Sequence, residues 1–67
     1  MPISARNQLV GTVASITLGG VMAEVVVSVG EHEIVSVVTR RSVEDLGLAV
    51  GDEVTAIIKS TEVILAR

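Results

Sequence analysis

Short runs of Val, Ile, Leu and Thr, separated by glycine-containing turns, make up most of this chain. Residues of these types favour the pleated, half-buried surface of a β-sheet. The pattern predicts strands at about residues 8–18, 21–29 and 33–39. Gly19-Gly20 separates the first two strands and Gly30-Glu31-His32 separates the next two. Short connections that contain glycine are typical of antiparallel hairpins, so the three strands are expected to pair in chain order.

The pattern changes at "SVEDLGL", which follows the third predicted strand. Ser42 and Asp45 have the spacing of a capping box, and Glu44 and Asp45 would lie in a first helical turn, where negative charge is favoured. Gly47 is then a natural residue to follow the helix end. This stretch therefore predicts a short helix of about one to one and a half turns.

Two more runs, "VTAIIK" and "EVILA", follow a turn at Gly51-Asp52 and are expected to be strands joined through Lys59-Ser60-Thr61. Three strands, a short helix and two strands follow the order of an OB-type barrel. The predicted fold class is all-β with one short helix, a five-stranded OB-like Greek-key barrel formed by a single domain over residues 1–67. An SH3-like barrel is the alternative.

The chain has 67 residues and no cysteine. A domain of this size is marginally stable alone and cannot gain a disulfide, so self-association is expected to add stability. Hydrophobic residues make up 49% of the chain and aromatic residues none. So many aliphatic side chains in so short a chain suggest that some are buried between subunits.

Several partners and locations are excluded by composition. The net charge of −3 and the lack of aromatic side chains argue against nucleic acid and against a membrane surface as partners. No apolar run approaches the roughly 20 residues that span a bilayer, and the start of the chain has no signal-peptide core. A cytoplasmic protein is expected.

No catalytic or cation-binding constellation is visible in the sequence. The only histidine, His32, lies in a predicted hairpin turn, where a solvated surface residue is the simplest interpretation. The chain has no cysteine nucleophile, no glycine-rich phosphate loop and no metal-ligand spacing. An enzyme is therefore not expected, nor are direct ligands for a metal cation.

Hydrogen-bond donors gather at three places in the chain. The groups are "SARNQ" near the start, "VVTRRS" in the middle and "KST" near the end. Hydroxyls and cations together can surround a small anion. The alternative is that all three groups are ordinary strand ends and turns.

The stretches "ISARNQLVGTV", "VVTRRSVEDLGLAVGDEV" and "TAIIKSTEVILA" resemble the molbindin or Mop family, small molybdate- and tungstate-binding domains of TOBE type. The resemblance covers nearly the whole chain. It implies an OB-like barrel that assembles into a hexamer, a trimer of dimers, and binds molybdate or tungstate reversibly at subunit interfaces without catalysis. The oxyanion-binding positions that carry over are Ser4, Ala5, Arg6, Asn7, Thr39, Ser42, Lys59, Ser60 and Thr61.

The expected role is molybdenum storage or homeostasis inside the cell. Two alternatives remain: a structural oligomerisation module, and a regulatory sensor that contacts a transporter or a regulator. A donor-only site suits molybdate and tungstate, which carry no proton at neutral pH, better than it suits protonated phosphate.

Overall fold

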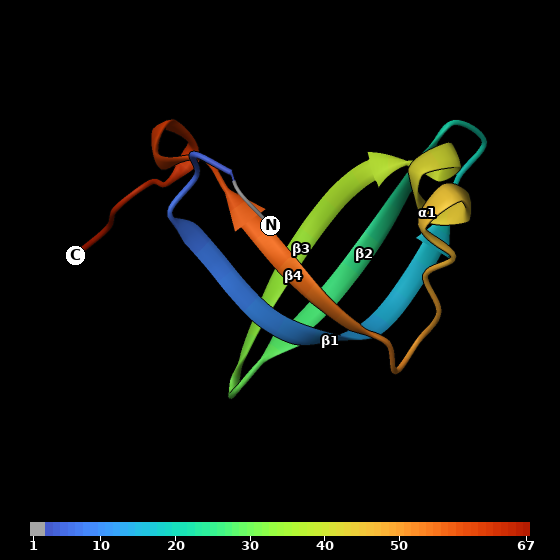
Figure 1. The fold of residues 1–67 in the computed structure, drawn as a ribbon, viewed down its shortest axis with the longest axis horizontal. Coiled ribbons are helices and arrows are strands. Elements are labelled where there is room, and N and C mark those ends of the chain that lie inside the picture. Colours follow the sequence, from blue (N-terminus) through green and yellow to red (C-terminus); the bar gives the residue numbers. More distant parts are fainter. Residues whose placement is uncertain (1–2) are drawn as a thin grey trace.

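A computed structural model describes residues 3–67 of the chain as a curved antiparallel sheet with a short helix at one end (Figure 1). Met1 and Pro2, which belong to the predicted 1–67 domain, lie outside the described residues. The elements are β1 (Asn7–Leu18), β2 (Met22–Val29), β3 (His32–Thr39), α1 (Arg40–Leu46), β4 (Glu53–Ile58) and the 3₁₀ turn η1 (Ser60–Glu62).

The sheet order is β3-β2-β1-β4, and β1 is its organising strand. The first half of β1 pairs with β4, from Asn7 opposite Ile58 to Thr12 opposite Glu53. Its second half pairs with β2, and the register shifts between Val13 and Ser15. An irregularity of this kind bends a strand and increases its twist. The long β1 therefore curves beneath the other strands (Figure 1).

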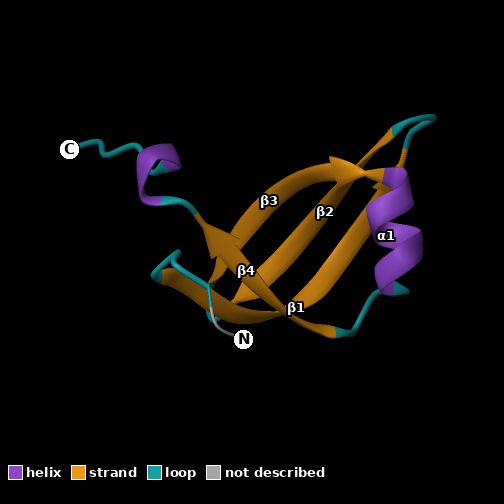
Figure 2. Cartoon of the chain, turned by 45° about the horizontal axis from the view of Figure 1, so that its top comes forward, coloured by secondary structure: helices purple, strands orange, loops and turns teal. Residues whose placement is uncertain are grey.

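The buried core is small and lies on the concave side of the sheet. It consists of Val13, Ala23, Val25, Val27 and Val43. Three of these alternate along β2, as expected for a strand with one face inward. Helix α1 covers one end of the curved sheet and contributes Val43 (Figure 2). The aliphatic core and the first three predicted strands are confirmed within one or two residues at each end.

The predicted start of the helix is wrong by three residues. Thr39, not Ser42, is the N-cap, and its Oγ1 accepts a hydrogen bond of 3.0 Å from the amide of Ser42. The helix thus begins directly where β3 ends, and Glu44 and Asp45 fall outside its first turn. The predicted C-terminal glycine is confirmed, because Gly47 adopts φ 62° and ψ 36°.

The predicted fifth strand does not form within the chain. After β4 the backbone turns through η1, and residues 63–67 have no regular structure. The side chains of Ile64 and Leu65 are 92% and 89% exposed. A four-stranded sheet therefore stays open between β3 and β4. Within residues 3–67, no helix is long and apolar enough to cross a membrane.

Candidate functional site

The two ends of the chain meet at one edge of the sheet. Because Asn7 opens β1 and pairs with Ile58 at the end of β4, the segments before Asn7 and after Ile58 lie side by side. Between them is a shallow cavity of about 180 Å³. It is lined by Ser4, Ala5, Lys59, Ser60 and Thr61. Two of the three donor groups in the sequence, 51 or more residues apart, thus share one site.

Two side-chain hydrogen bonds hold the N-terminal segment in this place. The Nδ2 group of Asn7 donates to the backbone oxygen of Ile58 at 3.2 Å, which ties the start of β1 to the end of β4. The Nε2 group of Gln8 donates to the backbone oxygen of Ala5 at 2.7 Å and folds the segment back on itself. Gln8 was not among the predicted site residues, although it belongs to the same "SARNQ" stretch.

The small cavity combines hydroxyl groups with one positive charge. Ser4, Ser60 and Thr61 offer hydroxyls, Lys59 offers an ammonium group, and none of the five lining residues is acidic. The nearest acidic residue in sequence, Glu62, follows in η1. A site with donors on several sides and no carboxylate is suited to an anion. Hydroxyl groups adjust their donor direction by rotation, so they fit several small oxyanions.

Arg6 and Asn7 lie beside this cavity rather than in its wall. Arg6 is exposed and sits between the lining residue Ala5 and the first residue of β1. Asn7 is half-buried, and its side-chain amide donates its hydrogen bond to the backbone oxygen of Ile58. Arg6 is therefore free to reach outward, whereas Asn7 positions the segment.

Thr39 and Ser42 lie elsewhere in the same chain. Thr39 pairs with Met22, whose neighbour Ala23 pairs with Leu18 at the end of β1. Almost the whole length of β1 therefore separates Thr39 from Asn7, which begins that strand. The hydroxyls of Thr39 and Ser42 are 2.7 Å apart at the start of α1, where that of Thr39 also caps the helix. One chain thus brings together the "SARN" and "KST" residues but not these two hydroxyls.

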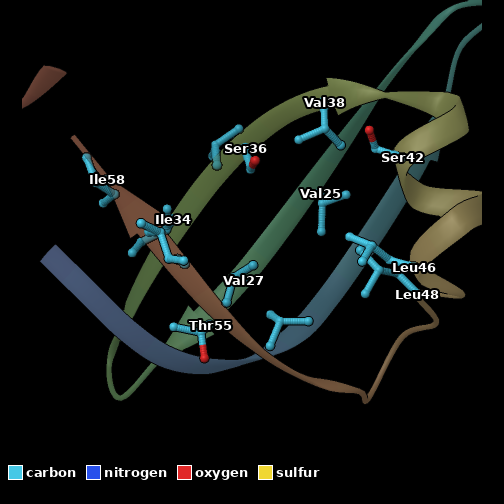
Figure 3. Close-up of a pocket in the computed structure, with 14 residues that line it drawn as sticks. Val25, Val27, Ile34, Ser36, Val38, Ser42, Leu46, Leu48, Thr55 and Ile58 are labelled. Carbon is cyan, nitrogen blue, oxygen red and sulfur yellow. The ribbon is translucent and has the colours of Figure 1, made fainter. Parts of the chain in front are cut away.

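A second, larger cavity occupies the concave side of the open sheet and has a volume of about 380 Å³. Val25, Val27, Ile34 and Val38 point into it, and Leu46 and Leu48 close it at the helix end (Figure 3). None of its lining residues is charged. It is a mostly apolar groove in which Ser36, Ser42 and Thr55 supply hydroxyl groups, and the described lining residues offer no cation to an oxyanion.

Acidic residues and the histidine do not cluster. Among residues 3–67, no three of the His, Cys, Asp and Glu side chains lie close enough to hold a metal ion together. His32 is exposed at the tip of the β2–β3 hairpin.

Comparison with known proteins extends these observations. The TOBE domain model matches residues 3–65. Molybdenum-pterin-binding protein 3 of Clostridium pasteurianum is 48% identical over 66 residues, 97% of each chain. The solved structure of a molybdate-binding protein from Sporomusa ovata has a TM-score of 0.95 and 45% identity over the full length of both chains.

A third similar protein is the cytoplasmic molybdate-binding protein ModG, solved with molybdate bound. The similarity has a TM-score of 0.85 and 44% identity, and covers 90% of this chain and 43% of that one. A family model that spans nearly the whole chain and a relative 48% identical over the same length agree. The chain belongs to the TOBE domain family, in its molbindin or Mop group, as the resemblance in its sequence predicted.

Proposed function

We propose that this chain binds molybdate or tungstate reversibly at interfaces between its own subunits and makes or breaks no covalent bond. One observation carries the proposal: Lys59, Ser60 and Thr61 form a cavity with Ser4 and Ala5 that holds donors and no carboxylate. The relatives named above support it, because their names and titles describe molybdenum or molybdate binding.

The site is proposed to be completed by a neighbouring copy. The small cavity is open to solvent, whereas a desolvated oxyanion is best held by donors on all sides. Thr39 and Ser42 are too far from the cavity in their own chain to contribute, since β1 lies between. Their counterparts on another copy are the candidates for the open side, together with Arg6, which is exposed beside the cavity.

Assembly itself is supported by the accessible surface of the chain, which is 5357 Å². A compact folded chain of this mass exposes roughly 4,000 Å². The excess is on the order of 1,300 Å², more than the roughly 800 Å² that each partner contributes to a standard interface. We propose the hexamer, a trimer of dimers, in which each sheet becomes part of a closed five-stranded OB-like Greek-key barrel.

The proposed biological role is storage or homeostasis of molybdenum in the cytoplasm, without catalysis. The description of ModG as cytoplasmic supports the location. A regulatory sensor is the second candidate role, and the two differ in partners. A sensor retains a transporter or regulator in a pull-down from cell extract, whereas a storage protein retains only copies of itself.

Native mass spectrometry tests the proposed function directly, because it reports subunit number and bound ions together. With molybdate or tungstate added, we expect an oligomer that carries a small whole number of oxyanions. Sulfate should bind more weakly because it is smaller, and phosphate should be rejected because its proton needs an acceptor. An oligomer with no bound molybdate, or one from which equimolar phosphate displaces molybdate, would contradict the donor-only site.

A further inference from the structure

Gln8 holds the carbonyl group of a residue that lines the small cavity. Its side-chain nitrogen Nε2 donates to the backbone oxygen of Ala5 at 2.7 Å, at the short end of the usual range for such a bond. Ala5 lies before the first residue of β1, so its carbonyl stands outside the hydrogen bonds of the sheet. Gln8 therefore fixes the direction in which the Ala5 carbonyl points.

The carbonyl is held toward a residue outside the cavity wall. Ala5 is among the described residues that line the cavity, whereas Gln8 is exposed and is not one of them. In a planar trans peptide, the carbonyl and the next amide point in opposite directions. None of the peptides in the described part of the chain is cis. Holding the Ala5 oxygen toward Gln8 thus turns the amide of Arg6, a donor, to the other side.

A free carbonyl at this place would change the chemistry of the site, where the start of the chain lies beside η1 (Figure 1). The described wall offers donors from the side chains of Ser4, Lys59, Ser60 and Thr61. A carbonyl oxygen only accepts, so one that turned inward would repel the oxygens of molybdate. The same oxygen would accept the proton that phosphate carries at neutral pH. One acceptor in the wall therefore weakens discrimination between the two anions in both ways.

We propose that Gln8 determines the specificity of the oxyanion site by holding the Ala5 carbonyl out of the cavity, which keeps the wall free of acceptors. Gln8 acts on the anion only through the Ala5 peptide, so it is a positioning residue. This role rests on the proposed function, because it concerns selection among oxyanions at the same cavity. Asn7 has a different role, since its side chain ties the segment to the backbone oxygen of Ile58 at 3.2 Å.

Competition between molybdate and phosphate tests the role of Gln8. Gln8→Met keeps the length of the side chain but removes its donor. We expect molybdate to bind more weakly. We also expect the ratio of the phosphate Kd to the molybdate Kd to fall by at least about tenfold, since an unpaired buried polar group carries a penalty of that order. Titration calorimetry with each anion alone and in competition measures both constants.

Two further variants separate this role from simple loosening of the N-terminal segment. Asn7→Ala removes the bond to Ile58 and should weaken the binding of both anions by the same factor, which leaves the ratio of the two Kd values unchanged. Thr12→Met places the same new side chain at another exposed position of β1, on the same face as Gln8, and should change neither constant. An unchanged ratio in Gln8→Met, or an equal fall of the ratio in Asn7→Ala, would overturn the proposal.

The Ala5 carbonyl can also be observed without any anion. The chain contains two Ala-Arg pairs, Ala5-Arg6 and Ala66-Arg67. Labelling alanine with ¹³C at the carbonyl and arginine with ¹⁵N therefore gives two carbonyl–nitrogen correlations in the NMR spectrum. Loss of a hydrogen bond to a carbonyl oxygen shifts its carbon signal upfield, so Gln8→Met should move the Ala5 signal and leave the Ala66 signal in place. An Ala5 signal that does not move would show that Gln8 does not hold this carbonyl.

The two measurements distinguish failure of the role of Gln8 from failure of the proposed function. An unaltered chain that binds neither molybdate nor tungstate overturns the proposed function and, with it, the selectivity assigned to Gln8. The spectra of the anion-free protein still decide whether Gln8 holds the carbonyl. A chain that binds molybdate, and that discriminates against phosphate equally well with Gln8→Met, overturns the role of Gln8 alone.

Discussion

At the scale of single residues, Lys59 is the most informative side chain. Among the described residues that line the small cavity, it supplies the only positive charge. A hydrogen bond to a charged group contributes roughly 1.5–3 kcal/mol. Lys59→Ala should therefore weaken molybdate binding by about 10- to 150-fold, measured by titration calorimetry.

The control for this prediction is another exposed cation of the same chain. Arg41 forms an ion pair with Asp45, at 3.9 Å between Nε and Oδ2, and both side chains are largely exposed. Arg41→Ala should leave the affinity unchanged. Arg6→Ala should weaken molybdate binding. Arg6→Lys should also weaken it if the planar guanidinium donates hydrogen bonds to the oxyanion, because Lys lacks that fork of donors. Unchanged affinity in both Lys59→Ala and Arg6→Ala would remove the proposed site.

Gly11 is the residue whose replacement should damage the fold most directly. A Cβ atom there would lie 2.5 Å from the backbone oxygen of Ser28 and 2.7 Å from Cγ1 of Val27. Gly11→Ala should lower the free energy of unfolding by about 1–3 kcal/mol, because neighbouring backbone must move. Urea denaturation measures this loss.

Gly20 is the matched control for that substitution. An added Cβ at Gly20 meets nothing within 4 Å, and Gly20 has no positive φ. Gly20→Ala should change the unfolding free energy by less than about 0.5 kcal/mol. Similar losses in the two variants would show that close approach of backbone is not what requires glycine at position 11.

At the scale of elements, helix α1 offers a prediction that separates capping from ligand binding. Thr39 Oγ1 accepts the amide of Ser42, so Thr39→Ala should cost about 1 kcal/mol of stability by losing the N-cap. Ser42→Ala keeps that hydrogen bond and should cost less. Thermal unfolding without oxyanion measures both.

The same pair of variants is then titrated with molybdate at a temperature where both are folded. If the hydroxyls of a neighbouring copy complete the site, Ser42→Ala lowers affinity more than it lowers stability. If Thr39→Ala loses stability and both variants keep their affinity for molybdate, the two hydroxyls stabilise the helix and do not bind the oxyanion.

Local patterns predicted most elements of this fold. Runs of Val, Ile and Thr define the first three strands, glycines mark the two hairpins, and Gly47 ends the helix at φ 62°. The helix start was misplaced because Thr39 and Ser42 are both good caps. Sequence alone does not show that Thr39 is the last residue of β3. Because the helix begins directly after that strand, Thr39 rather than Ser42 is the cap.

The C-terminal residues 63–67 and the small cavity show which contacts a single sequence does not predict. "EVILA" has strand-forming residues, yet it has no strand partner in its own chain because η1 directs it outward. Likewise "SARN" and "KST" were linked through a family resemblance, and pairing of Asn7 with Ile58 then brought them together. Spacing along the chain could not predict that contact, since residue pairing across a sheet is a long-range property.

At the scale of the whole molecule, stability and assembly should be inseparable. Among residues 3–67, only five side chains are buried in the core, and the exposed aliphatic residues include Val10, Val35, Val37, Ile64 and Leu65. A chain that gains much of its burial from other copies is expected to unfold and dissociate in one step. Its apparent stability then depends on protein concentration by mass action.

The size of this dependence can be estimated. A tenfold rise in concentration stabilises each chain by about 0.7 kcal/mol in an obligate dimer and by about 1.1 kcal/mol in an obligate hexamer. For a domain of this size, 1 kcal/mol corresponds to roughly 4–8 °C in Tm. We therefore expect Tm, followed by circular dichroism, to rise by about 3–9 °C per tenfold increase in concentration. A cooperative transition whose Tm stays constant over that range would mean that the small core of one chain suffices, and that the exposed aliphatic residues do not hold copies together.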